Sequence, residues 1–318
     1  MTSLSAGERA RLFDGLSSIC LAAGIDPSDA TLLRYTMNAV FRLEHAGVVV
    51  RMAPIINSDV VDRVAKVATA FGQLGLPTAR LAPGLSQPVA GGSWIATVWT
   101  LLPQVRGRRH DPADLAGPLR AIHALPEIDV ELPGWDPLGQ ISDLLSKAAS
   151  LTGADDDFLS DWATREFGLS IGQVLEHLWD KCGELAVDLE AVEWTLPRSV
   201  IHGDAHAGNL LDDLSGRVVI GDLDSVSIGP PEWDLIPAAH GALRFGDDPA
   251  QHRAFAQAYG LDVSACPAWD VLRQVRELQL VTSVIPDLRG RPGVASELAR
   301  RLASTLTGAV GESWNRYT

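Results

Sequence analysis

The sequence is poor in cysteine, in basic residues and in long apolar runs. Its three cysteines, Cys20, Cys182 and Cys266, lie far apart and form no Cys-x-x-Cys pair. This pattern argues against a disulfide framework or a zinc ribbon and favours a reducing cytoplasm. The N-terminus has no apolar signal core, and no apolar run approaches the ~18 residues of a membrane span. We therefore expect a cytoplasmic protein without a membrane partner.

Positive charge is scarce along the whole chain. The 26 Lys and Arg residues stand against 40 Asp and Glu residues, which gives a formal net charge of −14. Such a balance disfavours nucleic acid as a partner, because the phosphate backbone is itself negative. It is compatible with a cationic substrate, although acidic surfaces also serve solubility. With 318 residues, 46% of them hydrophobic, the chain has material for one large domain or two modest ones.

One stretch combines buried strands with the residue types of a catalytic loop. Residues 200–211 read VIHGDAHAGNLL, and residues 218–224 read VVIGDLD. The apolar runs predict short buried strands, and the acids, amide and glycines between them predict a loop. Asp204 and Asn209 have the Asp-x-x-x-x-Asn spacing of a kinase catalytic loop. Asp222 follows on a later strand, where a metal-binding Asp is expected.

Phosphoryl transfer explains why these residue types occur together. The reaction asks the protein to position the reactants and to neutralise phosphate charge. Asp204 is the candidate to accept the proton of an attacking hydroxyl. Asn209 and Asp222 offer oxygen ligands, which Mg²⁺ prefers. The pattern therefore predicts a magnesium-dependent phosphotransferase.

Three motifs in order resemble one family of small-molecule kinases. They are His-Gly-Asp-x-His-x-Gly-Asn at 202–209, Asp-x-Asp at 222–224, and Gly-Pro-Pro-Glu-Trp-Asp-Leu at 229–235. Together they resemble the aminoglycoside phosphotransferase family, which is similar to choline kinases and, more remotely, to protein kinases. The resemblance implies an α+β, protein-kinase-like fold with two lobes. A mixed β-sheet N-lobe would span 1–102, and a mostly helical C-lobe would span 103–318.

The resemblance also implies roles for residues outside the catalytic loop. Arg51 would contact the inner phosphates of ATP or GTP, and a backbone hinge at Thr100 and Leu102 would hold the base. Asn38 lies in a segment that resembles the family's opening hairpin, and it is a further candidate for nucleotide binding. Asp234 would brace the catalytic loop.

Three polar residues near the catalytic acid receive supporting roles. His202 would shape the loop, whereas His206 stands between such a role and contact with substrate or phosphate. Asp224 is a supporting acid at the position where protein kinases have the Gly of Asp-Phe-Gly. That difference, together with the lack of a Gly-rich loop, argues against a protein kinase.

The expected partner of Arg51 is missing from the sequence. Relatives usually carry a Glu on the following helix, which pairs with the basic residue. Here an apolar stripe runs along that helix, and Val64 falls at the Glu position; the stripe consists of Val60, Val64, Val67, Phe71 and Leu74. Asp59 and Asp62 match the position poorly. The partner of Arg51 therefore stays open.

Two alternatives to a kinase use the same residues. His202, Asp204 and His206 alternate, so on a strand they would share one face and could bind zinc in a metal-dependent hydrolase. That reading leaves Asn209 and Asp222 unexplained. A nucleotide-binding relative without activity is the second alternative, and it would not need Asp204. The favoured prediction is an enzyme that moves a γ-phosphoryl group to a hydroxyl of a small molecule, such as an aminoglycoside or another antibiotic.

Overall fold

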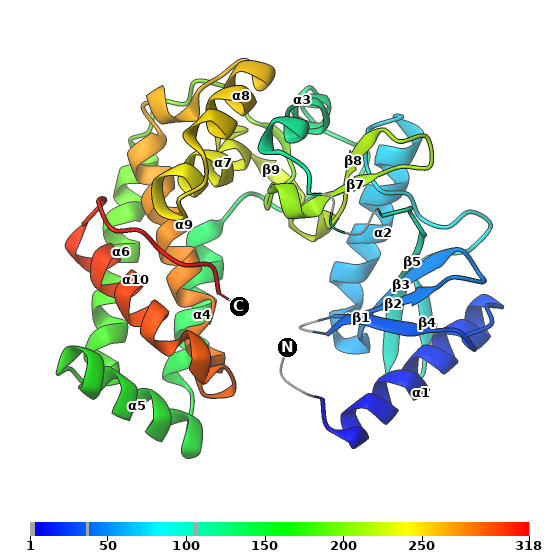
Figure 1. The fold of residues 1–318 in the computed structure, drawn as a ribbon, viewed down its shortest axis with the longest axis horizontal. Helices are drawn as coiled ribbons and strands as arrows, with labels where there is room; N and C mark the ends of the chain where they lie inside the picture. The colour runs from blue at the N-terminus through cyan, green and yellow to red at the C-terminus, as the bar shows by residue number, and fades with distance from the viewer. Residues whose placement is uncertain (1–3, 36–37, 105–106, 108, 318) are drawn as a thin grey trace. The chain divides into compact units, whose positions relative to one another are not determined.

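The computed structural model describes residues 4–35, 38–104, 107 and 109–317, and its contacts divide the chain into two compact units (Figure 1). Unit 1 combines Ser3–Pro133 with Arg198–Gly229, and unit 2 combines Gly134–Pro197 with Pro230–Thr318. The predicted lobe boundary after residue 102 falls within unit 1, just beyond its last sheet strand. The chain thus returns to unit 1 for the segment that carries the predicted catalytic loop.

A five-stranded sheet forms the first part of unit 1. Its strands are β1 (Thr31–Tyr35), β2 (Ala39–Leu43), β3 (Val48–Pro54), β4 (Val89–Gly91) and β5 (Trp94–Thr100). They lie in the order β1-β2-β3-β5-β4, and all neighbours are antiparallel. Along β2, buried and half-buried residues alternate as the pleat requires. Phe41 faces the core, while Val40 and Arg42 face the opposite side.

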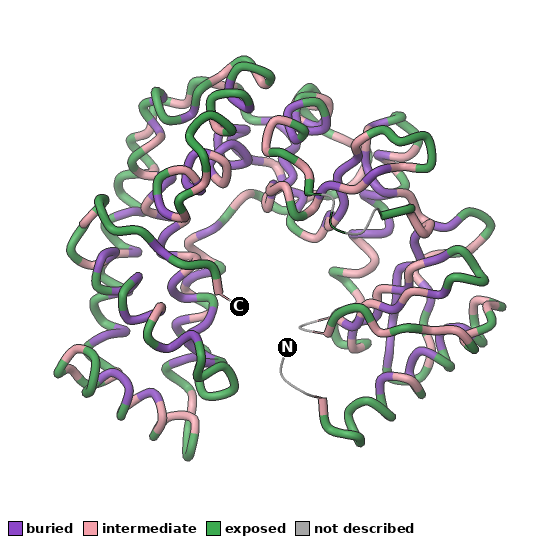
Figure 2. The backbone as a smooth tube through the Cα atoms, in the orientation of Figure 1, coloured by how far each residue is buried: buried purple, intermediate pink, exposed green. Residues whose placement is uncertain are grey.

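Two helices accompany this sheet. Helix α1 (Ala6–Ala23) begins with a capping box between Ser5 and Glu8, and it buries one face against the sheet while the other stays exposed (Figure 2). Helix α2 (Ser58–Gln73) buries Val64, Val67 and Phe71 of the predicted stripe. The two ends of that stripe, Val60 and Leu74, are exposed instead, because they occupy the first turn and the C-cap of the helix.

The second part of unit 1 holds two short antiparallel strand pairs and helix α3 (Ala116–His123). Strand β6 (Ser199–Ile201) pairs with β9 (Ser227–Gly229), and β7 (Leu210–Asp212) pairs with β8 (Val218–Ile220). The segment after α2 joins this part to the sheet. The Ala79 amide donates to the Ile220 carbonyl at 2.9 Å, and the Ile220 amide donates to the Pro77 carbonyl at 3.0 Å. The predicted strands on both sides of the catalytic loop are confirmed.

The regular elements of unit 2 in the residues that the structure describes are all helices. Its helices are α4 (Pro137–Ala149), α5 (Ala154–Phe167), α6 (Ile171–Glu190), α7 (Glu232–Arg244), α8 (Pro249–Tyr259), α9 (Trp269–Thr282) and α10 (Ala295–Thr307). Helices α4, α6 and α9 pack against one another. Glu277 of α9 is buried and accepts hydrogen bonds from Arg244 Nε at 2.7 Å and from an Arg273 Nη at 2.9 Å. The α+β prediction is confirmed.

Membrane-spanning helices are absent from the described part of the chain. None of its helices combines the necessary length with the necessary apolar character.

Candidate active site

His202 connects the two halves of the predicted catalytic segment. It is completely buried at the end of β6. Its Nδ1 accepts a hydrogen bond from the Asp204 amide at 3.4 Å, so the ring proton sits on Nε2. Nε2 then donates to the Gly221 carbonyl at 2.8 Å. One imidazole thereby holds the backbone of the catalytic loop against the residue that precedes Asp222.

Gly203 permits a close approach between the same two segments. Its φ of 86° lies in the left-handed region, which side chains disfavour. A Cβ at this position would overlap the backbone carbonyl oxygen of Ser225. Only glycine fits here, because the loop passes directly beside the short helical turn Leu223–Ser225.

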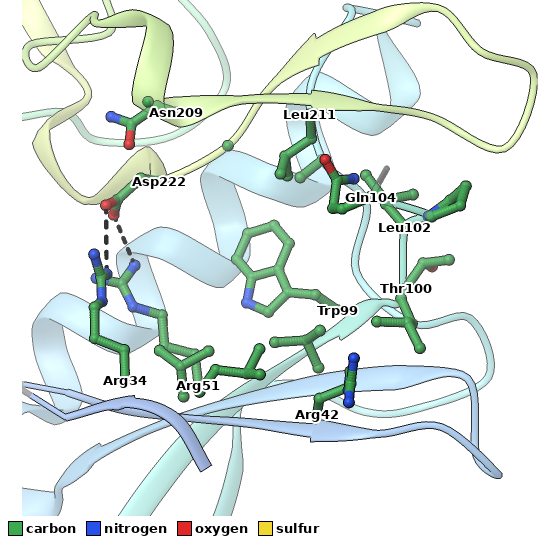
Figure 3. A pocket seen from close by; sticks show the side chains of 18 of the residues that line it. Arg34, Arg42, Arg51, Trp99, Thr100, Leu102, Gln104, Asn209, Leu211 and Asp222 are labelled. Carbon is green, nitrogen blue, oxygen red and sulfur yellow. Dashed lines mark ion pairs between the residues drawn. The ribbon is translucent and has the colours of Figure 1, made fainter. Parts of the chain in front are cut away.

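Asn209 and Asp222 face each other across the loop (Figure 3). The Asn209 side-chain amide donates to the Asp204 carbonyl at 2.9 Å, and the Gly221 amide donates to the Asn209 carbonyl at 2.8 Å. This arrangement turns the Asn209 amide oxygen toward Asp222. Asp222 has φ 57°, and it is the only non-glycine residue with positive φ in the described ranges. Such strain is typically stored at functional sites, where the surrounding structure holds it.

Asp204 presents its carboxylate to solvent. Its side chain is 40% exposed, and its Oδ2 lies 3.7 Å from Nε2 of His206. His206 precedes the short helical turn Ala207–Asn209, and its ring packs so closely over Gly208 that a Cβ there would lie 2.9 Å from Nδ1. The carboxylate is therefore reachable, while its backbone is fixed on both sides.

Arg51 on β3 pairs with Asp224, two residues after Asp222. Both of its Nη atoms donate to the Asp224 carboxylate, and Nη1 also lies 3.1 Å from Asp222 Oδ1. Burial raises the pKa of the Asp224 carboxyl, and the Arg51 charge acts against that rise. Val64, at the position of the family's helix Glu, is instead packed in the core. Asp224 is thus the ion-pair partner of Arg51, which the sequence did not identify. The sequence-based prediction gave Asp224 only a general supporting role.

A cavity of about 700 Å³ extends from Asp222 to the end of β5. Its apolar lining includes Val40, Val49, Ala79, Trp99 and Leu211. Thr100 and Leu102 also line it, as expected for a hinge. The Thr100 amide donates to Arg80 and the Leu101 amide to Gly47, at 2.9 and 2.8 Å, so the first two hinge amides are used within the protein.

For three residues, the lining of the cavity differs from what the sequence predicted. Asn38 lies at the bend before β2 and is not among the residues that line the cavity. Arg34 and Arg42 do line it, although neither was singled out from the sequence. Arg34 Nη2 lies 3.9 Å from Asp222 Oδ2.

The Gly-Pro-Pro-Glu-Trp-Asp-Leu motif enters unit 2. Asp234 is buried on α7, and its predicted bracing of the catalytic loop stays a prediction. Glu232 of the same motif is also buried. Its Oε1 accepts the amides of Thr195 and Leu196 at 2.7 and 2.9 Å, which anchors the segment that leads toward β6. Its motif position was the only sequence signal for this role.

The zinc alternative finds no support in the geometry. Within the described ranges, no group of three His, Cys, Asp or Glu side chains is arranged to hold a metal ion. Both ring nitrogens of His202 already face backbone groups, and the residues from 202 to 206 do not form a strand.

Solved structures with related folds include several small-molecule kinases. The amicoumacin kinase hAmiN, in complex with AMP-PNP, Ca²⁺ and Ami, has a TM-score of 0.66 at 14% identity over 98% of both chains. The choline kinase LicA from Streptococcus pneumoniae has a TM-score of 0.60 at 14% identity, over 95% of this chain and 99% of its own. Aminoglycoside phosphotransferase APH(3'')-Id from Streptomyces rimosus, with ADP and streptomycin, has a TM-score of 0.58 at 16% identity, over 84% and 98%.

These likenesses show a protein-kinase-like fold of the aminoglycoside phosphotransferase and choline kinase type. No curated protein sequence matches the chain. The model of the phosphotransferase enzyme family matches residues 36–275, which is more than half of the chain. The chain therefore belongs to the phosphotransferase enzyme family and has the fold of small-molecule kinases.

Proposed function

We propose that this protein is a Mg²⁺-dependent kinase that transfers the γ-phosphoryl group of ATP or GTP to a hydroxyl of a small molecule. One observation carries the proposal. Arg51, Asn209 and Asp222 come from three separate segments, yet they line one cavity, and Asn209 is hydrogen-bonded to the backbone of Asp204. These are the positioning and charge-neutralising groups that phosphoryl transfer requires.

The residues present fit a magnesium ion. Asn209 and Asp222 supply an amide oxygen and a carboxylate, which are ligands suited to a hard cation. The hydrogen bond from the Asn209 side-chain nitrogen to Asp204 leaves the amide oxygen turned toward Asp222 (Figure 3). When bound, the ion would add positive charge against the phosphate oxygens.

Asp204 acts on the acceptor. Its half-exposed carboxylate accepts a hydrogen bond from the attacking hydroxyl, orients it and takes its proton. His202 and Asn209 hold the amide and the carbonyl of Asp204, so the carboxylate is positioned before the acceptor arrives. Such preorganisation is the main means by which an enzyme accelerates this reaction. A module that only bound nucleotide would have no need of this acid.

The nucleotide occupies the cavity. Val40, Val49, Trp99 and Leu211 enclose the flat faces of the base, and the Leu102 amide is the next hinge donor after the two that the protein uses itself. Arg51 donates to phosphate oxygens, for which a guanidinium is well suited because it keeps its charge at any neutral pH. Asp224 keeps the guanidinium in place.

The acceptor is a small compound with a hydroxyl group, and a positively charged acceptor is favoured. The related folds include kinases solved with streptomycin and with spectinomycin, and the net charge of −14 favours cations. An aminoglycoside or another antibiotic is therefore the first class to test, and antibiotic resistance would follow as the biological role. The reaction would take place in the cytoplasm, where ATP is available and the three unpaired cysteines stay reduced.

The test is magnesium-dependent ADP or GDP release over a panel of aminoglycosides, macrolides, peptide antibiotics, amino alcohols and sugars. We expect turnover on one class, and Asp204→Asn should reduce it by at least about a hundredfold. Asp14→Asn, an exposed acid on α1, serves as the matched control and should keep full activity. Turnover that survives in Asp204→Asn, or a wild-type protein that binds neither MgATP nor MgGTP, would refute the proposal.

A further inference from the structure

A β-bulge in β1 turns two consecutive side chains toward the cavity. Thr31 pairs with Arg42 and Leu32 with Phe41, but the next pairs are Arg34 with Val40 and Tyr35 with Ala39. Leu33 is thus the additional residue. Consecutive residues of a regular strand point to opposite faces, yet Leu33 and Arg34 both line the cavity.

Without the bulge, Arg34 would point into the core. Leu32, on one side of the bulge, packs against the hydrophobic core, and so does Tyr35 on the other side. In a regular strand the residue two after Leu32 would share its face, which is the position of Arg34. The bulge places the charge on the cavity face instead and keeps Tyr35 in the core. Bulges often re-aim a side chain next to a functional site.

Arg34 is loosely held in the cavity. Its side chain is 56% exposed, and its Nη2 lies 3.9 Å from Asp222 Oδ2, beyond hydrogen-bond distance. An exposed contact of this length contributes little to stability. Arg51, by contrast, is engaged by both oxygens of Asp224. Figure 3 shows both guanidinium groups at the Asp222 end of the cavity, whereas Arg42 lies on the side of Thr100.

The sequence between β1 and β2 bears on the role of the Arg34 charge. Protein kinases cover the phosphates of the nucleotide with a glycine-rich loop. The residues from 35 to 38 here read Tyr-Thr-Met-Asn and contain no glycine. The Arg34 guanidinium, which lies near Asp222 in the cavity, can supply donors to phosphate oxygens in pairs instead.

We propose that Arg34 binds the terminal phosphates of the nucleotide, as a second cation beside Arg51 and in place of a glycine-rich loop. The inference rests on the proposed function. Before a nucleotide binds, Arg34 and Arg51 both face the carboxylate of Asp222. Asp222 is also a proposed metal ligand, so a metal ion held there would leave the Arg34 guanidinium available for phosphate oxygens.

The experiment measures nucleotide affinity by calorimetry with the full chain and Mg²⁺, using ATP, ADP and AMP, or the guanine series if GTP binds better. Arg34→Gln should weaken triphosphate binding about tenfold or more and leave monophosphate binding unchanged. Arg34→Lys should recover part of the loss, because it keeps the charge without the paired donors. Arg42→Gln is the matched control, since it removes the same group from the other end of the cavity. It should leave the ratio of triphosphate to monophosphate affinity unchanged.

The outcomes separate this inference from the proposed function. If the wild-type protein binds no nucleotide, the proposed function fails, and the role of Arg34 fails with it. If the wild type prefers ATP to AMP and Arg34→Gln keeps the same preference, only the inference is overturned. The inference is also overturned if Arg34→Gln changes only the affinity for Mg²⁺ measured without nucleotide, because Arg34 would then act only as a counter-ion of Asp222.

Discussion

The Arg51–Asp224 ion pair should be a major contact within unit 1. Their side chains are 16% and 29% exposed, so the pair is largely removed from water. A hydrogen bond to a charged group contributes about 1.5–3 kcal/mol, and Arg51 donates two to Asp224. The remaining exposure and the second acceptor at Asp222, 3.1 Å away, reduce the combined effect. We expect a coupling free energy of about 2 kcal/mol between the two side chains.

A double-mutant cycle measures this coupling. Arg51→Gln, Asp224→Asn and the double variant are unfolded in urea at pH 7, and the free energies of unfolding are compared with the wild type. The exposed pair of Arg289 with Asp155, at 3.1 Å, provides a control cycle in unit 2. Its coupling should stay below about 0.5 kcal/mol. If the two cycles give the same value, the conclusion that Asp224 holds Arg51 is refuted.

Two further predictions concern the loop and the core of unit 2. Gly203→Ala should abolish most activity and lower the free energy of unfolding by about 2 kcal/mol or more, because the Cβ overlaps a backbone oxygen. Gly24 has a similar positive φ but open space around it, so Gly24→Ala should lower the free energy of unfolding by about 1 kcal/mol and keep activity. Equal effects of the two substitutions would contradict the clash at Gly203. Burial opposes ionisation of Glu277, but His240, whose Nε2 lies 3.7 Å away, and the Arg244 and Arg273 guanidinium groups hold its pKa at about 2. Since that pKa lies below the ordinary 4.5, the carboxylate stabilises the fold above pH 4.5 and loses this effect as the pH falls toward 2. Glu277→Gln should therefore cost about 3 kcal/mol at pH 7 and progressively less on acidification, as urea unfolding at several pH values would show; a cost independent of pH would contradict the assignment.

The residues of the catalytic segment were predictable because their chemistry lies within short stretches of sequence. Asp204 and Asn209 share one loop, and apolar strands on both sides mark where that loop begins and ends. Asp222 follows directly after the buried strand β8 and Gly221. Motifs of this kind combine residue type with spacing, so a single sequence carries the information.

Arg34 and the partner of Arg51 depended on tertiary structure. The strand Thr-Leu-Leu-Arg-Tyr contains no glycine or proline that would mark a bulge, and the shift appears only in the pairing of β1 with β2. Asp224 reaches Arg51 because the left-handed backbone of Asp222 turns the chain into the short helical turn that follows. Val64 shows that a residue role known for a position in the family does not always apply to the same position in this chain. The helix is where the resemblance placed it, but the acid comes from another segment.

The return of the chain to unit 1 at Arg198–Gly229 has a consequence for how such a protein can diversify. The lining residues that the structure describes all belong to unit 1, although they come from segments more than a hundred positions apart in the chain. Changes in the α-helices from α4 to α10 therefore alter none of these residues. Sequence variation in unit 2 that keeps buried anchors such as Glu232 can therefore accumulate without replacing any residue that lines the cavity.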